Sequence, residues 1–121
     1  MGKTILVIDD SETILGLVSE TLRERGHEVL CESDVFSANR HIYRRKVDLI
    51  LLDVQMPSVS GNEVCRILKS KEETRAIPVV FFSDLPDAEL RRLAGEAGAD
   101  GWLSKGRGLS EVVAEVERRL G

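Results

Sequence analysis

Five short, strand-like runs alternate with five helix-like segments along the whole 121-residue chain. The runs span residues 5–8, 27–31, 48–53, 77–82 and 101–104. Strands that alternate with helices form parallel sheets, because each crossover between parallel strands uses a helix that packs back onto the sheet. The sequence therefore predicts one α/β domain over residues 1–121, with a doubly wound parallel sheet and helices on both faces.

The composition of the runs predicts their order in the sheet. Runs 5–8, 48–53 and 77–82 are almost wholly apolar, which is typical of strands buried on both faces. Runs 27–31 and 101–104 are short and mixed, as edge strands usually are. The order 2-1-3-4-5, the flavodoxin-like (βα)5 arrangement, satisfies both conditions. It places a switch point between the first and third strands, where open α/β sheets bind ligands.

Each helical segment has an apolar stripe that is expected to face the sheet. Ser11 and Asp34 are placed to cap the first two helices. The residues predicted to point inward are Ile14, Leu17, Val18, Thr21 and Leu22; Val35, Ala38, Ile42 and, as a further candidate, Tyr43; Val64, Ile67 and Leu68; Leu90, Leu93, Ala94 and Ala97; and Val112, Val113, Val116 and Leu120.

The overall composition excludes several classes of function. The formal net charge is −4, which argues against direct binding of nucleic acid by this chain alone. No apolar run approaches the roughly 20 residues that cross a membrane, and the N-terminus lacks a signal-peptide pattern. Cys31 and Cys65 have no metal-ligand spacing and are expected to be reduced thiols. These features predict a cytoplasmic protein with no membrane partner.

Polar residues follow the predicted strands at one edge of the sheet. Asp9 and Asp10 come after the first strand, Asp53 ends the third, Ser83 follows the fourth and Lys105 follows the last. Each alone has an ordinary explanation as a loop residue, a helix cap or a surface lysine. Because parallel strands end at the same edge, their joint placement predicts one shared site.

This set of side chains favours phosphoryl chemistry. Carboxylates crowded together need a cation or protons between them, and ligands that are all oxygen favour Mg²⁺, or Mn²⁺, over Zn²⁺. A lysine and a hydroxyl can hold phosphoryl oxygens, and an aspartate can itself be the nucleophile. No glycine-rich nucleotide-binding motif is present. The histidines, His27 and His41, are predicted to lie away from this edge, which argues against a His-based triad.

These residues resemble the receiver domain of two-component response regulators. The resemblance covers essentially the whole chain. Its motifs are the acidic pair Asp9-Asp10, the Asp-x-x-Met-Pro-x-x-x-Gly stretch over residues 53–61, Ser83, the stretch over residues 98–102, and Lys105. Together these motifs are highly specific for that family.

The resemblance implies a role for each matching position. Asp53 is the expected phosphoacceptor. Asp10, helped by Asp9, is the expected Mg²⁺ ligand, with Asp53 and the backbone carbonyl of Gln55 completing the protein ligands. Lys105 is expected to pair with the phosphoryl group. The donor is expected to be a phosphohistidine on a histidine kinase or phosphotransfer protein.

The resemblance also implies a switch and an output face. Ser83 is expected to bond a phosphoryl oxygen and move toward it. Trp102 lies where the family usually has a Tyr or Phe that changes rotamer, and it can be either such a switch or a fixed interface residue. The fourth helix, fifth strand and fifth helix, within residues 85–120, are expected to bind a downstream protein or form a homodimer. The chain ends at Gly121, as expected of a single-domain regulator or of a piece of a longer protein.

A further departure from the family pattern and two alternative functions accompany this interpretation. Lys105 is followed by Gly106, where the family usually has a proline. A phosphorylation-independent pseudo-receiver scaffold is the first alternative function. A Mg²⁺-dependent phosphohydrolase is the second and weaker one, because Gln55 is a poor proton donor. A receiver is not expected to be an enzyme beyond catalysing its own phosphorylation and dephosphorylation.

Overall fold

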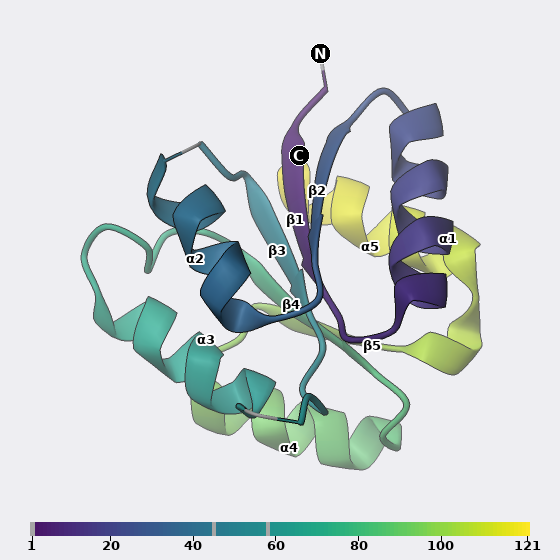
Figure 1. The fold of residues 1–121 in the computed structure, drawn as a ribbon. Coiled ribbons are helices and arrows are strands. Elements are labelled where there is room, and N and C mark those ends of the chain that lie inside the picture. The colour runs from purple at the N-terminus through teal and green to yellow at the C-terminus, as the bar shows by residue number, and fades with distance from the viewer. Residues whose placement is uncertain (1, 45, 58) are drawn as a thin grey trace.

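Residues 2–44, 46–57 and 59–121 are described in the computed structural model, where five parallel strands form one sheet (Figure 1). The strand order is β2-β1-β3-β4-β5, which confirms the predicted flavodoxin-like arrangement. The elements in chain order are β1 (Thr4–Ile8), α1 (Glu12–Glu24), β2 (Glu28–Glu32), α2 (Val35–Arg44), β3 (Leu49–Leu52), α3 (Gly61–Ser70), β4 (Val79–Ser83), α4 (Asp87–Ala97), β5 (Gly101–Ser104), a short 3-10 helix (Lys105–Arg107) and α5 (Leu109–Leu120).

The sheet separates two helical layers. Helices α1 and α5 cover one face, and α2, α3 and α4 cover the other (Figure 1). The strands supply both cores by alternation, so that Leu6 and Ile8 face α2–α4 whereas Ile5 and Val7 face α1 and α5. Every residue of the central strands β1, β3 and β4 is buried except Thr4, the first residue of β1, as their apolar sequences predict.

Local sequence signals place the helix ends. The Ser11 hydroxyl accepts a hydrogen bond from the backbone N–H of Ile14 at 3.3 Å, which caps α1. Asp34 accepts from the backbone N–H of Ser37 at 2.8 Å before α2. Gly98 ends α4 in the left-handed region, with φ 80°, where a glycine carries no steric penalty.

Three of the predicted inward residues are exposed. Leu17, Tyr43 and Ile67 have exposed fractions of 46%, 49% and 52%. In α3 the buried residues are Gly61, Val64, Cys65 and Leu68, a spacing of three and four that leaves Ile67 on the next face of the helix. In α1, Leu15 is buried in place of Leu17. The prediction was wrong at these positions because apolar residues at helical spacing do not show which adjacent face meets the sheet.

Two further sequence expectations concern the membrane and the thiols. Within the described ranges, no helix has the length and apolar character needed to cross a membrane. Cys31 and Cys65 are both free thiols. Burial raises the pKa of the Cys65 thiol to about 11, so that it is an unreactive core residue.

Candidate functional site

The first and third strands bring three aspartates together at the C-terminal edge of the sheet. Ile8 of β1 pairs with Leu52 of β3, and the backbone N–H of Asp53 donates to the Ile8 carbonyl at 2.9 Å. Asp9 and Asp53 therefore leave neighbouring strands side by side. Asp10 is the next residue along. One carboxylate oxygen from each of these three residues lies within 4.8 Å of the others.

The two inner carboxylates are buried and held by the backbone. Asp9 has no exposed surface and Asp53 is 2% exposed, whereas Asp10 faces solvent. The backbone N–H of Ser11 donates to Asp9 Oδ1 at 2.9 Å, and that of Gln55 donates to Asp53 Oδ1 at 2.9 Å. Each acid thus has one oxygen fixed by the turn that follows its own strand, which leaves Oδ2 facing the site.

Lys105 follows β5 directly, and its side chain reaches the carboxylates at the ends of β1 and β3. Its Nζ lies 2.8 Å from Asp9 Oδ2 and 3.7 Å from Asp53 Oδ2. The ammonium also lies 5.7 Å from the centroid of the Phe82 ring. Burial lowers the pKa of Lys105, but Asp9 and Asp53 outweigh burial and raise the pKa overall. Lys105 therefore stays charged beside the two buried carboxylates.

The cluster keeps an excess of negative charge that one lysine does not balance. Burial is the main cause of the raised pKa of Asp53, and the neighbouring Asp9 and Asp10 add to it against the Gln55 N–H and Lys105. The Lys105 ammonium, 2.8 Å from Asp9 Oδ2, is the partner of that buried oxygen, and it is shared with Asp53 Oδ2 at 3.7 Å. Three carboxylates that crowd around one ammonium form an all-oxygen donor set that fits a hard divalent cation.

Ser83 is connected to the loop after Asp53 through a side chain. Ser83 ends β4 with no exposed surface, and its hydroxyl donates to Gln55 Oε1 at 2.8 Å. The same hydroxyl oxygen accepts from the backbone N–H of Leu85 at 3.3 Å. Sequence reasoning assigned only the backbone carbonyl of Gln55 and missed this side-chain contact. No sequence signal identifies it, because it joins two loops that only the fold brings together.

Gly61 packs closely against the backbone of Asp53 and Val54. It begins α3, and a Cβ on it would lie 2.3 Å from the Asp53 carbonyl oxygen and 2.7 Å from the Val54 Cα. The start of α3 therefore lies against the backbone that carries Asp53. Sequence reasoning included Gly61 only as the glycine that ends the stretch over residues 53–61, with no contact assigned to it. The Asp-to-Gly spacing of the motif was the signal that could have identified this contact.

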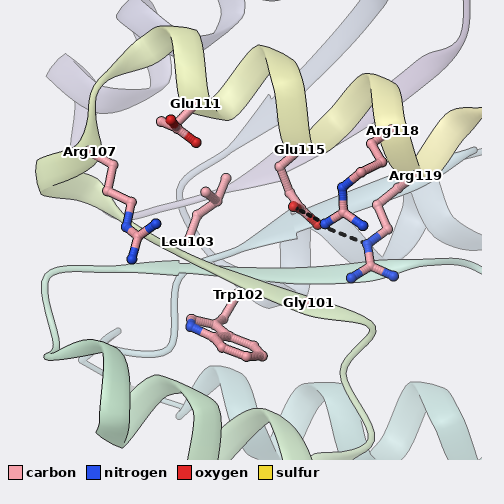
Figure 2. Close-up of a pocket in the computed structure, with 8 residues that line it drawn as sticks. All are labelled: Gly101, Trp102, Leu103, Arg107, Glu111, Glu115, Arg118 and Arg119. Carbon is pink, nitrogen blue, oxygen red and sulfur yellow. Dashed lines mark hydrogen bonds and ion pairs between the residues drawn. The ribbon is translucent and has the colours of Figure 1, made fainter.

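Trp102, Gly106 and the two histidines lie outside this cluster. Trp102 on β5 is 37% exposed and points away from α5, toward the opposite helical layer (Figure 2). Gly106 lies in the 3-10 helix, and its backbone N–H donates to Ser104 Oγ at 3.3 Å. His27 contacts Glu117 and His41 contacts Glu32. Neither histidine contacts the three aspartates within the described part of the chain, as expected.

Comparison with known proteins identifies relatives of this arrangement. The sequence model of the family described as the response regulator receiver domain matches residues 5–117. A crystal structure of a putative response regulator from Chloroflexus aurantiacus J-10-fl is 27% identical, with a TM-score of 0.92 over 99% of this chain and 98% of that one. The chemotaxis response regulator CheY4 of Vibrio cholerae is 26% identical, with a TM-score of 0.90 over 98% and 99%.

A third structure carries a metal ion. The receiver domain of the sensor histidine kinase PA1611 from Pseudomonas aeruginosa PAO1 is 25% identical. The match covers 100% of this chain and 99% of that one, with a TM-score of 0.88. That structure has a magnesium ion coordinated in its active-site cleft.

Proposed function

Because the chain belongs to the family of response regulator receiver domains, we propose that residues 1–121 act as a phosphoacceptor module in two-component signalling. Asp53 takes the phosphoryl group from a phosphohistidine on a histidine kinase or phosphotransfer protein. The observation that carries this proposal is the buried Asp53 carboxylate, whose Oδ2 lies 3.7 Å from the Lys105 ammonium. A cytoplasmic location for this module stays a prediction.

The residues at the edge of the sheet suit this transfer. Asp53 Oδ1 is held by the Gln55 N–H, so Oδ2 is the oxygen that we assign as the nucleophile. The new bond joins Oδ2 to phosphorus, the bond from phosphorus to the donor's imidazole nitrogen breaks, and the imidazole leaves and takes up a proton. Lys105 is placed to pair with a phosphoryl oxygen and to stabilise its charge.

The acidic residues are the ones that would hold a divalent cation. Asp9, Asp10 and Asp53 supply carboxylates, and the Gln55 carbonyl is the fourth expected protein ligand. Bound Mg²⁺, or Mn²⁺, would neutralise charge on the carboxylates and on the incoming phosphoryl oxygens. The excess of negative charge supports this assignment, because the three clustered carboxylates outnumber the Lys105 ammonium that pairs with two of them.

Ser83 and Gln55 form the switch part of the proposal. The Ser83 hydroxyl donates a hydrogen bond to Gln55 Oε1, so it must leave that acceptor before it can donate to a phosphoryl oxygen. Phosphorylation thereby exchanges one hydrogen bond of Ser83 for another and moves the end of β4. The output face is proposed to consist of α4, β5 and α5, where a downstream protein or a second copy binds.

The proposed output face has a cavity of about 290 Å³ between β5 and α5 (Figure 2). Its lining residues are Gly101, Trp102, Leu103, Arg107, Glu111, Glu115, Arg118 and Arg119. Glu115 pairs with Arg118 and, at 2.8 Å, with Arg119. Both guanidinium groups are tied to this one acid, so a partner that offers carboxylates must compete with Glu115 for them.

The direct test is phosphoryl uptake by the purified chain. With acetyl phosphate and Mg²⁺, intact-mass spectrometry is expected to show the mass of one added phosphoryl group, and EDTA is expected to prevent its addition. Failure to label under these conditions would contradict the proposal and favour the pseudo-receiver scaffold. Turnover of a small phosphomonoester would instead favour the phosphohydrolase.

Gly106 is expected to limit how well Lys105 is placed. A glycine after Lys105 leaves the backbone freer than the usual proline does. Gly106→Pro is therefore expected to label faster with acetyl phosphate than the wild type. A Cβ at this position meets nothing closer than Ser104 Oγ at 3.7 Å, so Gly106→Ala is a matched control for added bulk. Equal rates for all three proteins would contradict the prediction.

Trp102 is expected to report the switch, because it is the only tryptophan in the sequence. With Mg²⁺ and beryllofluoride as a phosphoryl mimic, its emission is expected to shift as the ring changes its exposure. The same titration of a variant with asparagine at Asp53 provides the control. An unchanged emission spectrum, with binding established independently by size and mass analysis, would favour a fixed interface residue.

A further inference from the structure

An apolar groove runs between α2 and α3, on the face of the sheet opposite α5. Helix α3 packs against α4, whereas a groove of about 320 Å³ lies between α3 and α2. The residues that line it are Val35, Phe36, Asn39, Tyr43, Val59, Val64, Ile67, Leu68 and Lys71. A smaller hollow shares Val35, Phe36 and Val59 with it and extends to Met56 and Pro57, in the loop that follows Asp53. The groove therefore begins beside the phosphoacceptor loop.

Exposed apolar side chains concentrate in this groove. Phe36 is 74% exposed, Ile67 52% and Tyr43 49%. They are three of the five large hydrophobic residues that are exposed within residues 2–44, 46–57 and 59–121. The other two, Leu17 and Trp102, lie on α1 and β5. Solvent-facing aromatic residues that gather in a hollow are typical of binding sites for protein partners.

The charge at one end of the groove selects the kind of partner. Lys71 lines that end, with its Nζ 3.3 Å from the Tyr43 hydroxyl and 5.6 Å from the centroid of its ring. Lys71 is the charged residue among the described residues that line the groove, since Arg40 and Arg44 of α2 do not line it and Arg40 pairs with Glu32 at 3.6 Å. Asp34, at the opposite end, is occupied by the Ser37 N–H and hydroxyl. Glu72 and Glu73 follow Lys71 in the chain but do not line the groove.

We propose that the groove between α2 and α3 binds an amphipathic helix of a partner protein, with acidic residues of that helix at the Lys71 end. Its apolar stripe packs on Phe36, Tyr43 and Ile67. Helix α2 has ten residues and is about 15 Å long, so the groove accommodates about three turns of a partner helix beside it. A second copy of this chain is a poorer occupant, because two such grooves would bring the Lys71 ammonium of each copy toward that of the other.

This surface is separate from the proposed output face on α4, β5 and α5. The groove is present without phosphorylation of Asp53. Its inner end includes Met56 and Pro57, in the loop that follows Asp53, so phosphorylation and binding in the groove can influence each other. A partner bound here would contact α2 and α3, whereas one bound at the output face would contact α4, β5 and α5. The chain could then connect two proteins at the same time.

The test uses two synthetic amphipathic helical peptides and the full chain. Both have leucines three and four residues apart, and one carries glutamates at the polar positions of one end where the other carries lysines. The acidic peptide is expected to shift backbone amide resonances of α2 and α3 saturably, to bind at least about tenfold more tightly than the basic one, and to bind more weakly at high salt.

Two pairs of variants distinguish specific binding in this groove from nonspecific binding to exposed apolar residues. Phe36→Ser is expected to weaken the acidic peptide about tenfold or more, whereas Leu17→Ser, exposed on α1, is expected to leave its affinity unchanged. Lys71→Glu is expected to reverse the preference between the peptides, and Arg91→Glu on α4 to leave it in place. Because Phe36 is mostly exposed, thermal unfolding of Phe36→Ser is expected to match the wild type.

Three outcomes would overturn the proposal. They are no binding of the acidic peptide, equal binding of both peptides, and amide shifts that lie outside α2, α3 and the loop between β3 and α3. Concentration-dependent self-association of the chain that Phe36→Ser abolishes would likewise replace the partner helix with a second copy.

Discussion

Replacing Asp53 with asparagine is expected to abolish phosphoryl uptake and leave the fold intact. The amide of asparagine keeps an oxygen that accepts from the Gln55 N–H, which holds Asp53 Oδ1 at 2.9 Å in the wild type. It loses the anionic oxygen that faces Lys105, and a neutral amide is a far weaker nucleophile than a carboxylate. Intact-mass spectrometry after incubation with acetyl phosphate and Mg²⁺ is expected to show no modified protein.

A second aspartate at the same edge of the sheet provides the control for that experiment. Asp84 follows Ser83 directly, is exposed, and lies outside the cluster of three carboxylates. Asp84→Asn is expected to take up one phosphoryl group as the wild type does. Labelling that persists in Asp53→Asn, or that is lost equally in Asp84→Asn, would show that Asp53 is not the acceptor.

Asp53→Asn is also expected to change the stability of the fold, by an amount that depends on pH. Burial raises the pKa of Asp53, so the folded state holds this proton more tightly than the unfolded state does. The free energy of unfolding then falls as pH rises from the ordinary aspartate pKa, about 3.9, through the raised value. Without divalent cations, Asp53→Asn is expected to be more stable than the wild type at neutral pH, and the two are expected to converge below about pH 4. Urea unfolding in EDTA at several pH values checks this, and a variant that is less stable at neutral pH contradicts it.

Replacing Gly61 with alanine is expected to produce a large loss of stability from a single added methyl group. A Cβ at Gly61 would lie 2.3 Å from the Asp53 carbonyl oxygen and 2.9 Å from the Asp53 carbonyl carbon, both backbone atoms that no rotamer change can move. Helix α3 must shift away from the end of β3, which opens the packing of Val64 and Leu68. The free energy of unfolding is expected to fall by about 3 kcal/mol, at the upper end of the usual range for overpacking.

The shift of α3 in Gly61→Ala is also expected to slow phosphoryl uptake, because it moves the backbone that carries Asp53. Gly95→Ala is the matched control, since Gly95 lies within α4 and its added Cβ meets nothing within 4 Å. That variant is expected to gain about 0.5–1 kcal/mol from helix propensity and to label normally. Urea unfolding of both variants tests the pair, and equal stabilities would contradict the contact at Gly61.

Much of the fold could be predicted from the sequence because the strands differ in composition. The almost wholly apolar strands lie in the centre, the mixed strands lie at the edges, and the resulting order is 2-1-3-4-5. That order alone implies that Asp9 and Asp53 leave neighbouring strands. The helix faces were less predictable, since Leu17, Tyr43 and Ile67 satisfy a helical period and yet lie outside the core.

The sequence by itself determined the sheet, its switch point and the residues that meet there, because periodicity and strand ends are local properties of the chain. Only the tertiary structure decided which oxygen of each acid is fixed by the backbone, that Lys105 pairs with Asp9 Oδ2, and that Gln55 holds the Ser83 hydroxyl. It also decided that Tyr43 and Ile67 line a groove with Phe36. These features depend on distances between residues far apart in the sequence, and such distances follow from how the helices pack on the sheet.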